Sequence, residues 1–349
     1  MTTTAAAGIA VRTVDNIESR GEWQRAAVAL HASGLAHSAE WFDAIRDGYG
    51  HEPLYLAADT DEGCAGILPA FIVRRPVLGT VITSMPFLDG GGPCAVTPEA
   101  ADALVRQLLQ TARAMNARSV ELRCSERLAT DIAPDEHKVT LTLELPGDPD
   151  VLWRGFDKTV RNQVRKAERS GLTVESGGAQ TFEPFYDIFA GRMRELGSPV
   201  HAAGFLQSVL RRFGDRARIS LVRQGQAAIA GLVTLAFKDR IAVPWAACRK
   251  ESLPLCPNML LYWEAIRTAC LDGRRWFDFG RSTRGSGTYR FKRQWGASEA
   301  PLFWYTFAAD GVRGNDGLGS RRLAEHVWQR LPLGITRRIG PRIRKYLIQ

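Results

Sequence analysis

The chain has 349 residues, 45% of them hydrophobic and 24% charged, which is typical of a globular protein large enough for two domains. Its six cysteines form no CxxC pair and no ligand-like spacing with histidine, so we expect a reducing compartment and no zinc or other metal site. No apolar run approaches the ~20 residues of a membrane span, and the first ten residues lack the basic start of a signal peptide. These features predict a cytoplasmic protein.

One order of elements occurs twice along the chain. The first copy is a short amphipathic helix and two strands, predicted over residues 41–50, 54–58 and 65–71. The second copy follows at an offset of 164 residues, over 205–214, 219–223 and 230–237. Each half then has an alanine-containing helix leading to a strand with an acidic residue, from Ala112 to Leu122 and from Ala269 to Phe279. Two copies predict a duplicated domain of the α+β class.

A loop at residues 145–149 separates the two copies. Asp148 suits a helix N-cap and Pro149 the first helical position, so a helix is expected to open the second half. We predict an N-terminal domain, a C-terminal domain and a basic amphipathic tail, over 1–145, 146–310 and 311–349.

The helix that opens the second half is predicted to have two contrasting faces. Its apolar side chains recur every three or four residues, at Trp153, Phe156, Val160, Val164 and Ala167. Its basic side chains have the same spacing, at Arg154, Lys158, Arg161, Arg165 and Arg169. Gly171 is placed to end the helix. Like charges in one stripe repel each other, so we expect either a polyanionic ligand along this face or a solvated basic surface.

The segment 277–296 has the composition of an anion-binding loop at the end of a buried strand. An apolar and aromatic run ends at Asp278, and a Gly/Ser loop follows, with Lys292 shortly after it. Small residues allow close backbone approach, and cations supply charge for a phosphate or carboxylate. The candidate binding residues are Arg281, Arg284, Gly285, Ser286, Gly287 and Tyr289. The alternative is a solvated basic loop.

The tail is strongly basic. Residues 321–349 carry eight basic side chains, Arg321 and Arg322 among them, and one acidic side chain, Glu325. Interleaved apolar residues suit the surface of an anionic membrane, although a phosphate backbone would also attract this tail. The alternative is a helical hairpin packed on the body with its basic face in water. Pro332 and Pro341 are expected to break any long helix.

Several separated motifs occur in one order along the chain, namely Ser84–Gly91, Val160–Ala167, Arg194–Pro199, Leu261–Ile266 and Phe277–Trp295. Together they resemble the FemABX-like branch of the GNAT (acyl-CoA N-acyltransferase-like) superfamily, over about residues 40–305. The resemblance is strongest to FemAB-type proteins found with exosortase (PEP-CTERM) and exopolysaccharide gene clusters. The resemblance implies two tandem GNAT-like domains, with central mixed sheets flanked by helices.

The resemblance also implies acyl or aminoacyl transfer to an amine. Arg161 or Arg165, together with Lys292, match basic residues that look like those holding acceptor phosphates or stabilising the transition state. A fixed cation stabilises the charge on a tetrahedral oxygen, which supports this role for Lys292. Asp278 would orient a cation or take a proton from the amine. The alternative for Asp278 is a salt bridge to a neighbouring arginine.

The chain departs from the family pattern at the donor site. Neither half has the Arg/Gln-x-x-Gly-x-Gly/Ala loop that holds the CoA pyrophosphate. The first half offers Asp89 and Gly90 in a glycine run, which either lines a cleft or forms a turn. A long helical arm for tRNA is absent too, so the donor stays open between acyl-CoA and aminoacyl-tRNA, and no cofactor is assigned. Trp245 and Trp263 are expected in the core, and Asn258 as an N-cap.

Three functions are compatible with these features. The favoured one is an acyl- or aminoacyltransferase for an envelope polysaccharide or a lipid-linked diphosphate precursor. The others are a catalytically silent subunit of polysaccharide assembly and an RNA-binding protein. The expected partners are a diphosphate- or lipid-linked sugar, tRNA as a carrier, and the inner membrane through the tail, but not DNA. Lys292 is expected outside the core, so Lys292→Ala should abolish activity without unfolding the protein.

Overall fold

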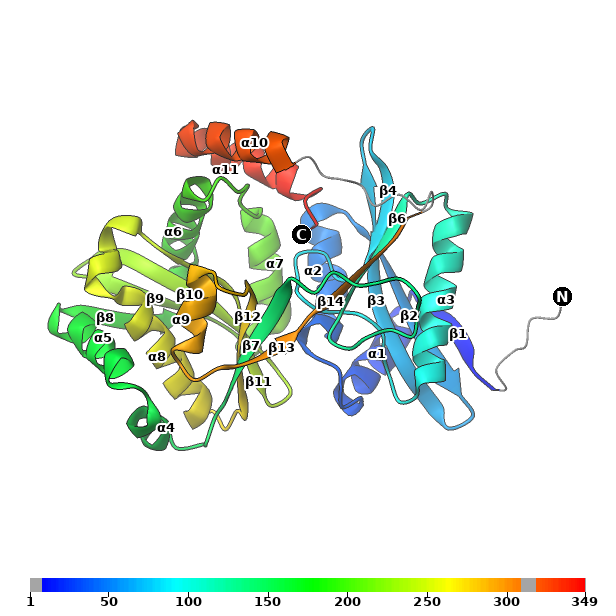
Figure 1. Ribbon diagram of the computed structural model, residues 1–349, viewed down its shortest axis with the longest axis horizontal. Helices are drawn as coiled ribbons and strands as arrows, with labels where there is room; N and C mark the ends of the chain where they lie inside the picture. Colours follow the sequence, from blue (N-terminus) through cyan, green and yellow to red (C-terminus); the bar gives the residue numbers. More distant parts are fainter. Residues whose placement is uncertain (1–7, 309–317, 349) are drawn as a thin grey trace. The chain divides into compact units, whose positions relative to one another are not determined.

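The computed structural model describes residues 8–308 and 318–348, which form two compact units. Unit 1 comprises Met1–Val139, Ala300–Gly314 and Ile348–Gln349, and unit 2 comprises Thr140–Glu299 and Asn315–Leu347. Both contain helices and strands, and two seven-stranded sheets mix parallel and antiparallel pairs (Figure 1). The predicted α+β class is therefore confirmed. The finer domain bounds at 145 and 310 stay a prediction.

Unit 1 has the sheet order β1-β2-β3-β4-β6-β14, with β5 paired to β3. Its elements are β1 (Ala10–Val14), α1 (Ile17–Ala29), α2 (Glu40–Tyr49), β2 (Glu52–Thr60), β3 (Gly63–Arg75), β4 (Gly79–Thr83), β5 (Cys94–Ala95), α3 (Pro98–Ala114), β6 (Ser119–Cys124) and β14 (Phe303–Ala308).

Alternation along β2 places helices on both faces of this sheet. Leu54 and Leu56 belong to the core cluster that includes Leu104 of α3. Between them, Tyr55 points to the other face, where its ring centroid lies 4.5 Å from that of Trp23 in α1. Burial of such side chains is worth about 1.5–3 kcal/mol each. The sheet of unit 1 therefore has an apolar layer on each of its two faces.

Unit 2 has a sheet in the order β13-β7-β12-β11-β10-β9-β8. Its elements are α4 (Pro149–Gly155), α5 (Lys158–Arg169), β8 (Leu172–Gly177), α6 (Phe182–Glu195), α7 (Ala203–Phe213), β9 (Ala217–Gln224), β10 (Ala227–Phe237), β11 (Arg240–Cys248), α8 (Pro257–Leu271), β12 (Trp276–Thr283) and α9 (Gly287–Arg293). The strands β7 (Lys138–Glu144) and β13 (Ser298–Pro301) complete the sheet.

The two sheets repeat one topology, as the sequence predicts. In unit 1, β2, β3 and β4 pair antiparallel, and β4 then pairs parallel with β6. In unit 2, β9, β10 and β11 pair antiparallel, and β11 pairs parallel with β12. The helix before each parallel strand is α3 in one case and α8 in the other. A crossover helix is what a parallel connection requires.

The last strand of unit 1 comes from the far end of the chain. β14 pairs antiparallel with β6 from Phe303 opposite Cys124 to Ala308 opposite Ser119. Unit 1 is thus built from three segments that are separated in sequence by the two segments of unit 2.

Three local expectations need correction. The single helix predicted after residue 149 is two helices, because Phe156 and Asp157 take extended conformations between α4 and α5. Asn258 is not an N-cap: α8 has Cys256 at that position and Pro257 as its first residue. Pro341 does not end its helix. The N-cap at Asp148, by contrast, is confirmed, since its side chain accepts from the N–H of Asp150.

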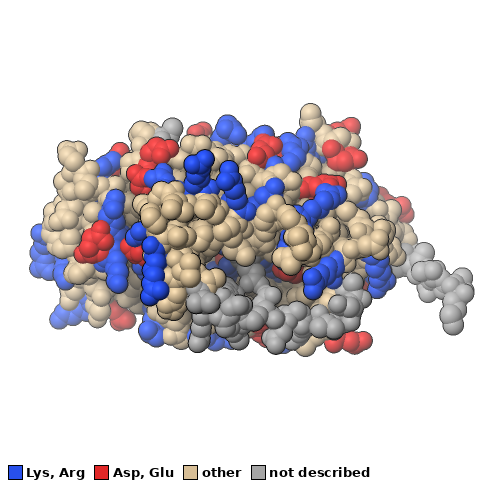
Figure 2. Space-filling model, turned by 90° about the horizontal axis from the view of Figure 1, so that it is seen from above, with Lys and Arg blue, Asp and Glu red and all other residues tan. Residues whose placement is uncertain are grey.

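The tail forms α10 (Leu318–Arg330) and α11 (Leu333–Arg344), which contact α6 of unit 2. Figure 2 views the molecule from above, where Lys and Arg side chains border a tan surface over these helices. Residues 311–317 and the predicted basic side chains of Arg321 and Arg322 lie outside the described residues. No helix in the described ranges is both long and apolar enough to cross a bilayer.

Candidate functional site

The parallel strands β11 and β12 of unit 2 pair over only three positions. The last pair is Ala242 with Asp278. Directly after it, β11 has a bulge, in which Val243 and Pro244 lie opposite the single residue Thr234 of β10. A bulge bends its strand and leaves ladder groups unpaired. Beyond Asp278, β11 and β12 therefore no longer pair with each other.

Asp278 marks the point where the strands separate. Its Oδ1 accepts from Thr140 Oγ1 of β7 at 3.2 Å and from the backbone N–H of Gly280 at 2.8 Å. Gly280 has φ 73°, a conformation that favours glycine. The carboxylate of Asp278 thus stabilises a kink within β12.

Lys292 of α9 lies at the same kink. Its Nζ donates to the carbonyl oxygens of Gly280 at 2.9 Å and Arg281 at 2.7 Å. The residue is only 9% exposed, so the expectation that it lies outside the core is wrong. Burial of an ammonium requires hydrogen-bond acceptors, and the strand end supplies them. Sequence reasoning missed this because the acceptors are main-chain atoms.

The Gly/Ser loop is shorter than predicted, and its polar groups are engaged within unit 2. Ser286 caps α9 by accepting from the N–H of Tyr289. Arg284 Nε lies 3.1 Å from Glu299 Oε1, and the hydroxyl of Tyr289 donates to Glu299 Oε2 at 2.6 Å. The hydrogen bond from Tyr289, and to a smaller extent the contact with Arg284, hold the pKa of Glu299 below its ordinary value. Glu299, which the sequence did not single out, therefore offsets part of the loop's positive charge.

The basic face of α5 has a different character. Arg161 is half-buried, and its Nε finds no hydrogen-bond partner among the described residues. The guanidinium of Arg165 lies over the ring of Trp153, 5.7 Å from its centroid. Several further cations of α4 and α5 are exposed, namely Arg154, Lys158, Lys166 and Arg169. Within the described parts of the chain, none of these six cations forms an ion pair. This face can bind an anion without first breaking an internal bridge.

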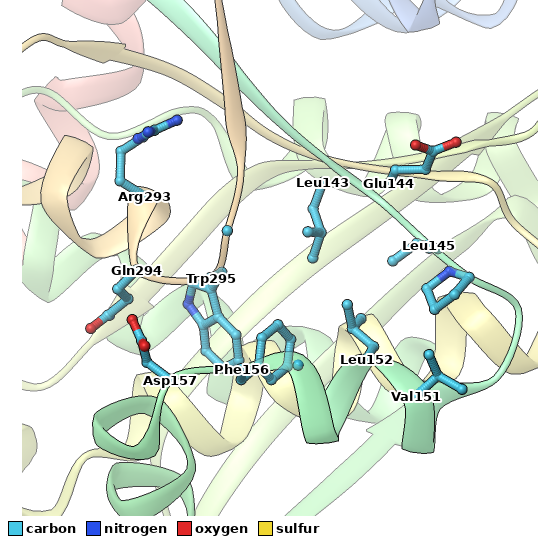
Figure 3. A pocket seen from close by; sticks show the side chains of 13 residues that line it. Leu143, Glu144, Leu145, Val151, Leu152, Phe156, Asp157, Arg293, Gln294 and Trp295 are labelled. Atoms are coloured by element: carbon cyan, nitrogen blue, oxygen red, sulfur yellow. The ribbon is translucent and has the colours of Figure 1, made fainter.

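A pocket of about 550 Å³ lies beside the C-terminal end of α9 (Figure 3). Its apolar wall includes Leu143, Leu152, Phe156 and Trp295, and the Phe156 and Trp295 rings pack edge to face at 5.2 Å. Its polar lining is Glu144, Asp157, Arg293 and Gln294. The extended Phe156–Asp157 break between α4 and α5 forms one side. Neither Asp278 nor Lys292 lines this pocket.

In unit 1, the glycine run has a packing reason. A Cβ on Gly91 would lie 2.4 Å from Met85 Cγ, and one on Gly92 would lie 2.5 Å from Cys124 Sγ. A Cβ on Gly90 would meet nothing within 4 Å. Close approach of the backbone therefore explains two of the three glycines. The substrate contacts predicted for Asp89 and Gly90 stay a prediction.

Arg123 organises the same loop, and sequence reasoning missed it. It is 2% exposed on β6, and its guanidinium donates to Leu88 O at 2.5 Å and to Ile348 O. Its backbone N–H donates to Ser84 Oγ at 2.8 Å. A buried arginine with carbonyl acceptors holds a loop in one shape. The only sequence signal was a charge inside a strand pattern.

The structure thus brings part of the predicted site together. Asp278, Arg281 and Lys292 share the kink of β12, and the loop residues 284–289 follow it directly. Arg161 and Arg165 lie on α5 of the same unit. Asp89 and Gly90 belong to unit 1. Trp245 and Trp263 are each 7% exposed, so their predicted place in the core is confirmed.

Comparison with known proteins identifies the fold. Residues 154–293 match the model described as "Acetyltransferase (GNAT) domain". No curated protein matches the chain. The solved structure titled "Crystal structure of FemX" is 14% identical with a TM-score of 0.66, covering 85% of this chain and 97% of that chain.

Two further solved structures have similar coverage. The C-terminal domain of a putative lysylphosphatidylglycerol synthetase from Agrobacterium fabrum is 12% identical with a TM-score of 0.57, covering 85% of this chain and 94% of that chain. A tandem GNAT protein from the clavulanic acid biosynthesis pathway is 12% identical with a TM-score of 0.53, covering 87% of this chain and all, 100%, of that chain. The tandem GNAT-like fold is therefore shown, and within it residues 154–293 are similar to an acetyltransferase (GNAT) domain.

Proposed function

We propose that the protein is a FemAB-like N-acyltransferase, which transfers an acyl or aminoacyl group to an amine. The observation that carries this proposal is the placement of Asp278 and Lys292 at the kink of β12, where β11 and β12 separate. The match of residues 154–293 to a GNAT domain supports it, because the match contains both residues.

The chemistry follows from the groups at this kink. An attacking amine forms a bond to the donor's carbonyl carbon and must lose a proton, and the carbonyl oxygen gains negative charge. Collapse of this intermediate breaks the bond to CoA sulfur or tRNA oxygen, and the leaving group departs with the proton as a thiol or hydroxyl. Asp278 is the proton acceptor in this scheme, since its carboxylate lies at the open strand end. Lys292 supplies positive potential and holds the carbonyls of Gly280 and Arg281 in place. The edge of β11 after its bulge, which no longer pairs with β12, binds the donor as an added strand would.

The acceptor is an amine on a phosphate-bearing molecule, of the kind used for an envelope polysaccharide or a lipid-linked diphosphate precursor. Arg161 and Arg165 bind its phosphates, because the α5 face carries cations without internal ion pairs. The donor is an acyl-CoA or an aminoacyl-tRNA. We place the reaction in the cytoplasm and, from the resemblance of its motifs, in exopolysaccharide (PEP-CTERM) biosynthesis of the cell envelope.

A screen of donors and acceptors tests the transfer. The purified chain is incubated with acetyl-CoA, longer acyl-CoAs or aminoacyl-tRNA together with UDP-amino sugars, and products are identified by mass spectrometry. An acylated amine that disappears with Asp278→Asn supports the proposal. Absence of product from every pair, with donor binding also absent, would overturn it.

The role of α5 is tested separately by binding. Arg161→Gln with Arg165→Gln should weaken binding of a UDP-sugar about tenfold or more and reduce its salt dependence. Arg218→Gln is a matched control in the same unit, since Arg218 is exposed on β9 and lies 3.9 Å from Asp272. Equal losses in both variants would show a non-specific charge effect.

One observation favours a second candidate, a catalytically silent binding or scaffold subunit of polysaccharide assembly. Arg284 and Tyr289 are engaged with Glu299, so the loop offers less free charge than its composition indicates. This alternative predicts tight binding of a nucleotide sugar with no turnover for any donor. In that case Asp278→Asn leaves the binding constant unchanged.

A further inference from the structure

The tail helix α11 has an apolar stripe on its outer side. Ile335, Ile339, Ile343 and Leu347 are exposed by 42%, 40%, 38% and 43%. They recur every fourth residue, so the first three lie one above the other on the helix and Leu347 continues the row beyond its end. Scattered exposed apolar residues need no explanation, but a continuous row marks an interaction surface.

The opposite side of α11 is fixed to unit 2, which sets the direction of this stripe. Arg337 forms an ion pair with Asp187 of α6, and its guanidinium lies over the ring of Tyr186 at 5.1 Å. Gly340 approaches Val200 so closely that a Cβ would lie 3.2 Å from its backbone nitrogen. Rotation of the helix to bury the isoleucines would break these contacts.

Exposed arginines accompany the stripe. Arg338 and Arg342 each lie three residues after an isoleucine of the row, and Arg330 lies at the end of α10. In residues 324–348, where side chains of the tail are described, these three arginines form no ion pair. The helix α11 itself contains no acidic residue. The surface is therefore apolar along its centre and positive beside it.

We propose that α11 is a membrane-binding helix that lies flat on an anionic lipid bilayer. The isoleucines enter the acyl boundary, and Arg338 and Arg342 reach lipid phosphates with their charged ends while their stems stay in the apolar layer. A phosphate backbone of nucleic acid would use the arginines but leave the apolar row in water. Two copies joined through this face would bring like charges together. Charge and apolarity thus favour anionic lipid.

Vesicle flotation with the full chain tests this proposal. Vesicles of phosphatidylglycerol mixed with phosphatidylcholine should bind the protein, and pure phosphatidylcholine should bind at least about tenfold less. Ile339→Asp with Ile343→Asp should lower binding to the anionic vesicles about tenfold or more. Arg338→Gln and Arg342→Gln should each cost about fivefold, and 0.5 M salt should mimic their combined loss.

The matched control is Leu271→Asp, which introduces the same charge at a 63% exposed residue ending α8. It should leave flotation unchanged. Thermal unfolding of each variant shows whether the fold is retained. Equal flotation of the wild-type chain and the Ile339/Ile343 variant overturns the proposal. So does a dimer in light scattering that this variant abolishes while neither protein binds vesicles, because the face then joins two copies.

Discussion

Asp278 and Lys292 hold the two sides of one residue, Gly280. The carboxylate of Asp278 accepts from the N–H of Gly280 at 2.8 Å, and Lys292 Nζ donates to its carbonyl oxygen at 2.9 Å. Both peptide groups of a residue with positive φ are thereby fixed. The two residues proposed for the chemistry also maintain the strand end where that chemistry is placed, so their roles must be separated by experiment.

Substitution of Lys292 is expected to affect stability as well as activity. Lys292→Met keeps the length of the side chain but leaves the carbonyls of Gly280 and Arg281 without this donor. We expect a loss of about 1–3 kcal/mol in unfolding free energy, measured by urea denaturation, together with loss of transfer. Lys250→Met, at an exposed lysine, is the control and should be within about 0.5 kcal/mol of wild type. An unchanged midpoint for Lys292→Met would contradict the structural role.

Asp278→Asn separates charge from geometry at the same kink. Asparagine retains an acceptor for the N–H of Gly280, so unfolding free energy should stay within about 1 kcal/mol of wild type. Loss of the carboxylate should lower the transfer rate about 100-fold or more if it takes the amine proton. Thr140→Val, which removes only the hydroxyl donor to Asp278, should cost about 1 kcal/mol with little effect on rate. If Asp278→Asn instead retains the transfer rate but loses unfolding free energy, Asp278 has only a structural role.

The glycine run of unit 1 offers a matched pair of alanine substitutions. Gly92→Ala should destabilise the protein by about 2 kcal/mol or more, because its Cβ would also lie 3.1 Å from the Cα of Cys124. Gly90→Ala should leave stability within about 0.5 kcal/mol, because space is open there. If Gly90→Ala nevertheless weakens binding of a UDP-sugar in calorimetry, the predicted contact at Asp89 and Gly90 gains support. Equal melting of both variants would contradict the packing argument.

Because of His201, the unfolding free energy should decrease as the pH is lowered. Burial, and then the charge of Arg344, hold the pKa of His201 well below its ordinary value of about 6.5. Below pH 6.5 the unfolded chain therefore binds a proton that the folded chain does not bind, so acid favours unfolding. The slope from this group reaches at most about 1.4 kcal/mol per pH unit. The urea midpoint, measured at pH 7.5, 6.0 and 5.0, should decrease less with decreasing pH for His201→Gln than for wild type. An equal decrease in both proteins would contradict the assignment.

Local pattern was sufficient for much of the fold. The repeat, its helices and its strands follow from apolar spacing and from glycines such as Gly50 and Gly171, which are found at φ 67° and 72° after α2 and α5. The break between α4 and α5 was not predictable in this way. Phe156 continues the helical spacing, and its extended conformation instead lets its ring pack on Trp263 and Trp295.

The sequence predicted which residues belong to the candidate site, but it did not predict their hydrogen-bond partners. Composition identified Asp278 and Lys292, because a carboxylate and a cation follow a buried run. Their acceptors and donors are backbone atoms of Gly280 and the hydroxyl of Thr140, which lies 138 residues away in sequence. Arg123 is similar: its acceptors are carbonyls of a loop and of Ile348. Main-chain acceptors leave no mark in composition or spacing.

The return of β14 to the sheet of unit 1 has a consequence for synthesis. The ribosome completes β6 about 180 residues before β14, which at ~5–20 residues per second is a delay of about 10–35 s. For that time the newly made β6 has no partner on one side, and an open strand edge recruits other chains. Nascent chains halted after Glu299, before β14 is made, would carry the same exposed edge. The sheet of unit 1 is therefore completed after the sheet of unit 2, although its strands are the first to be made.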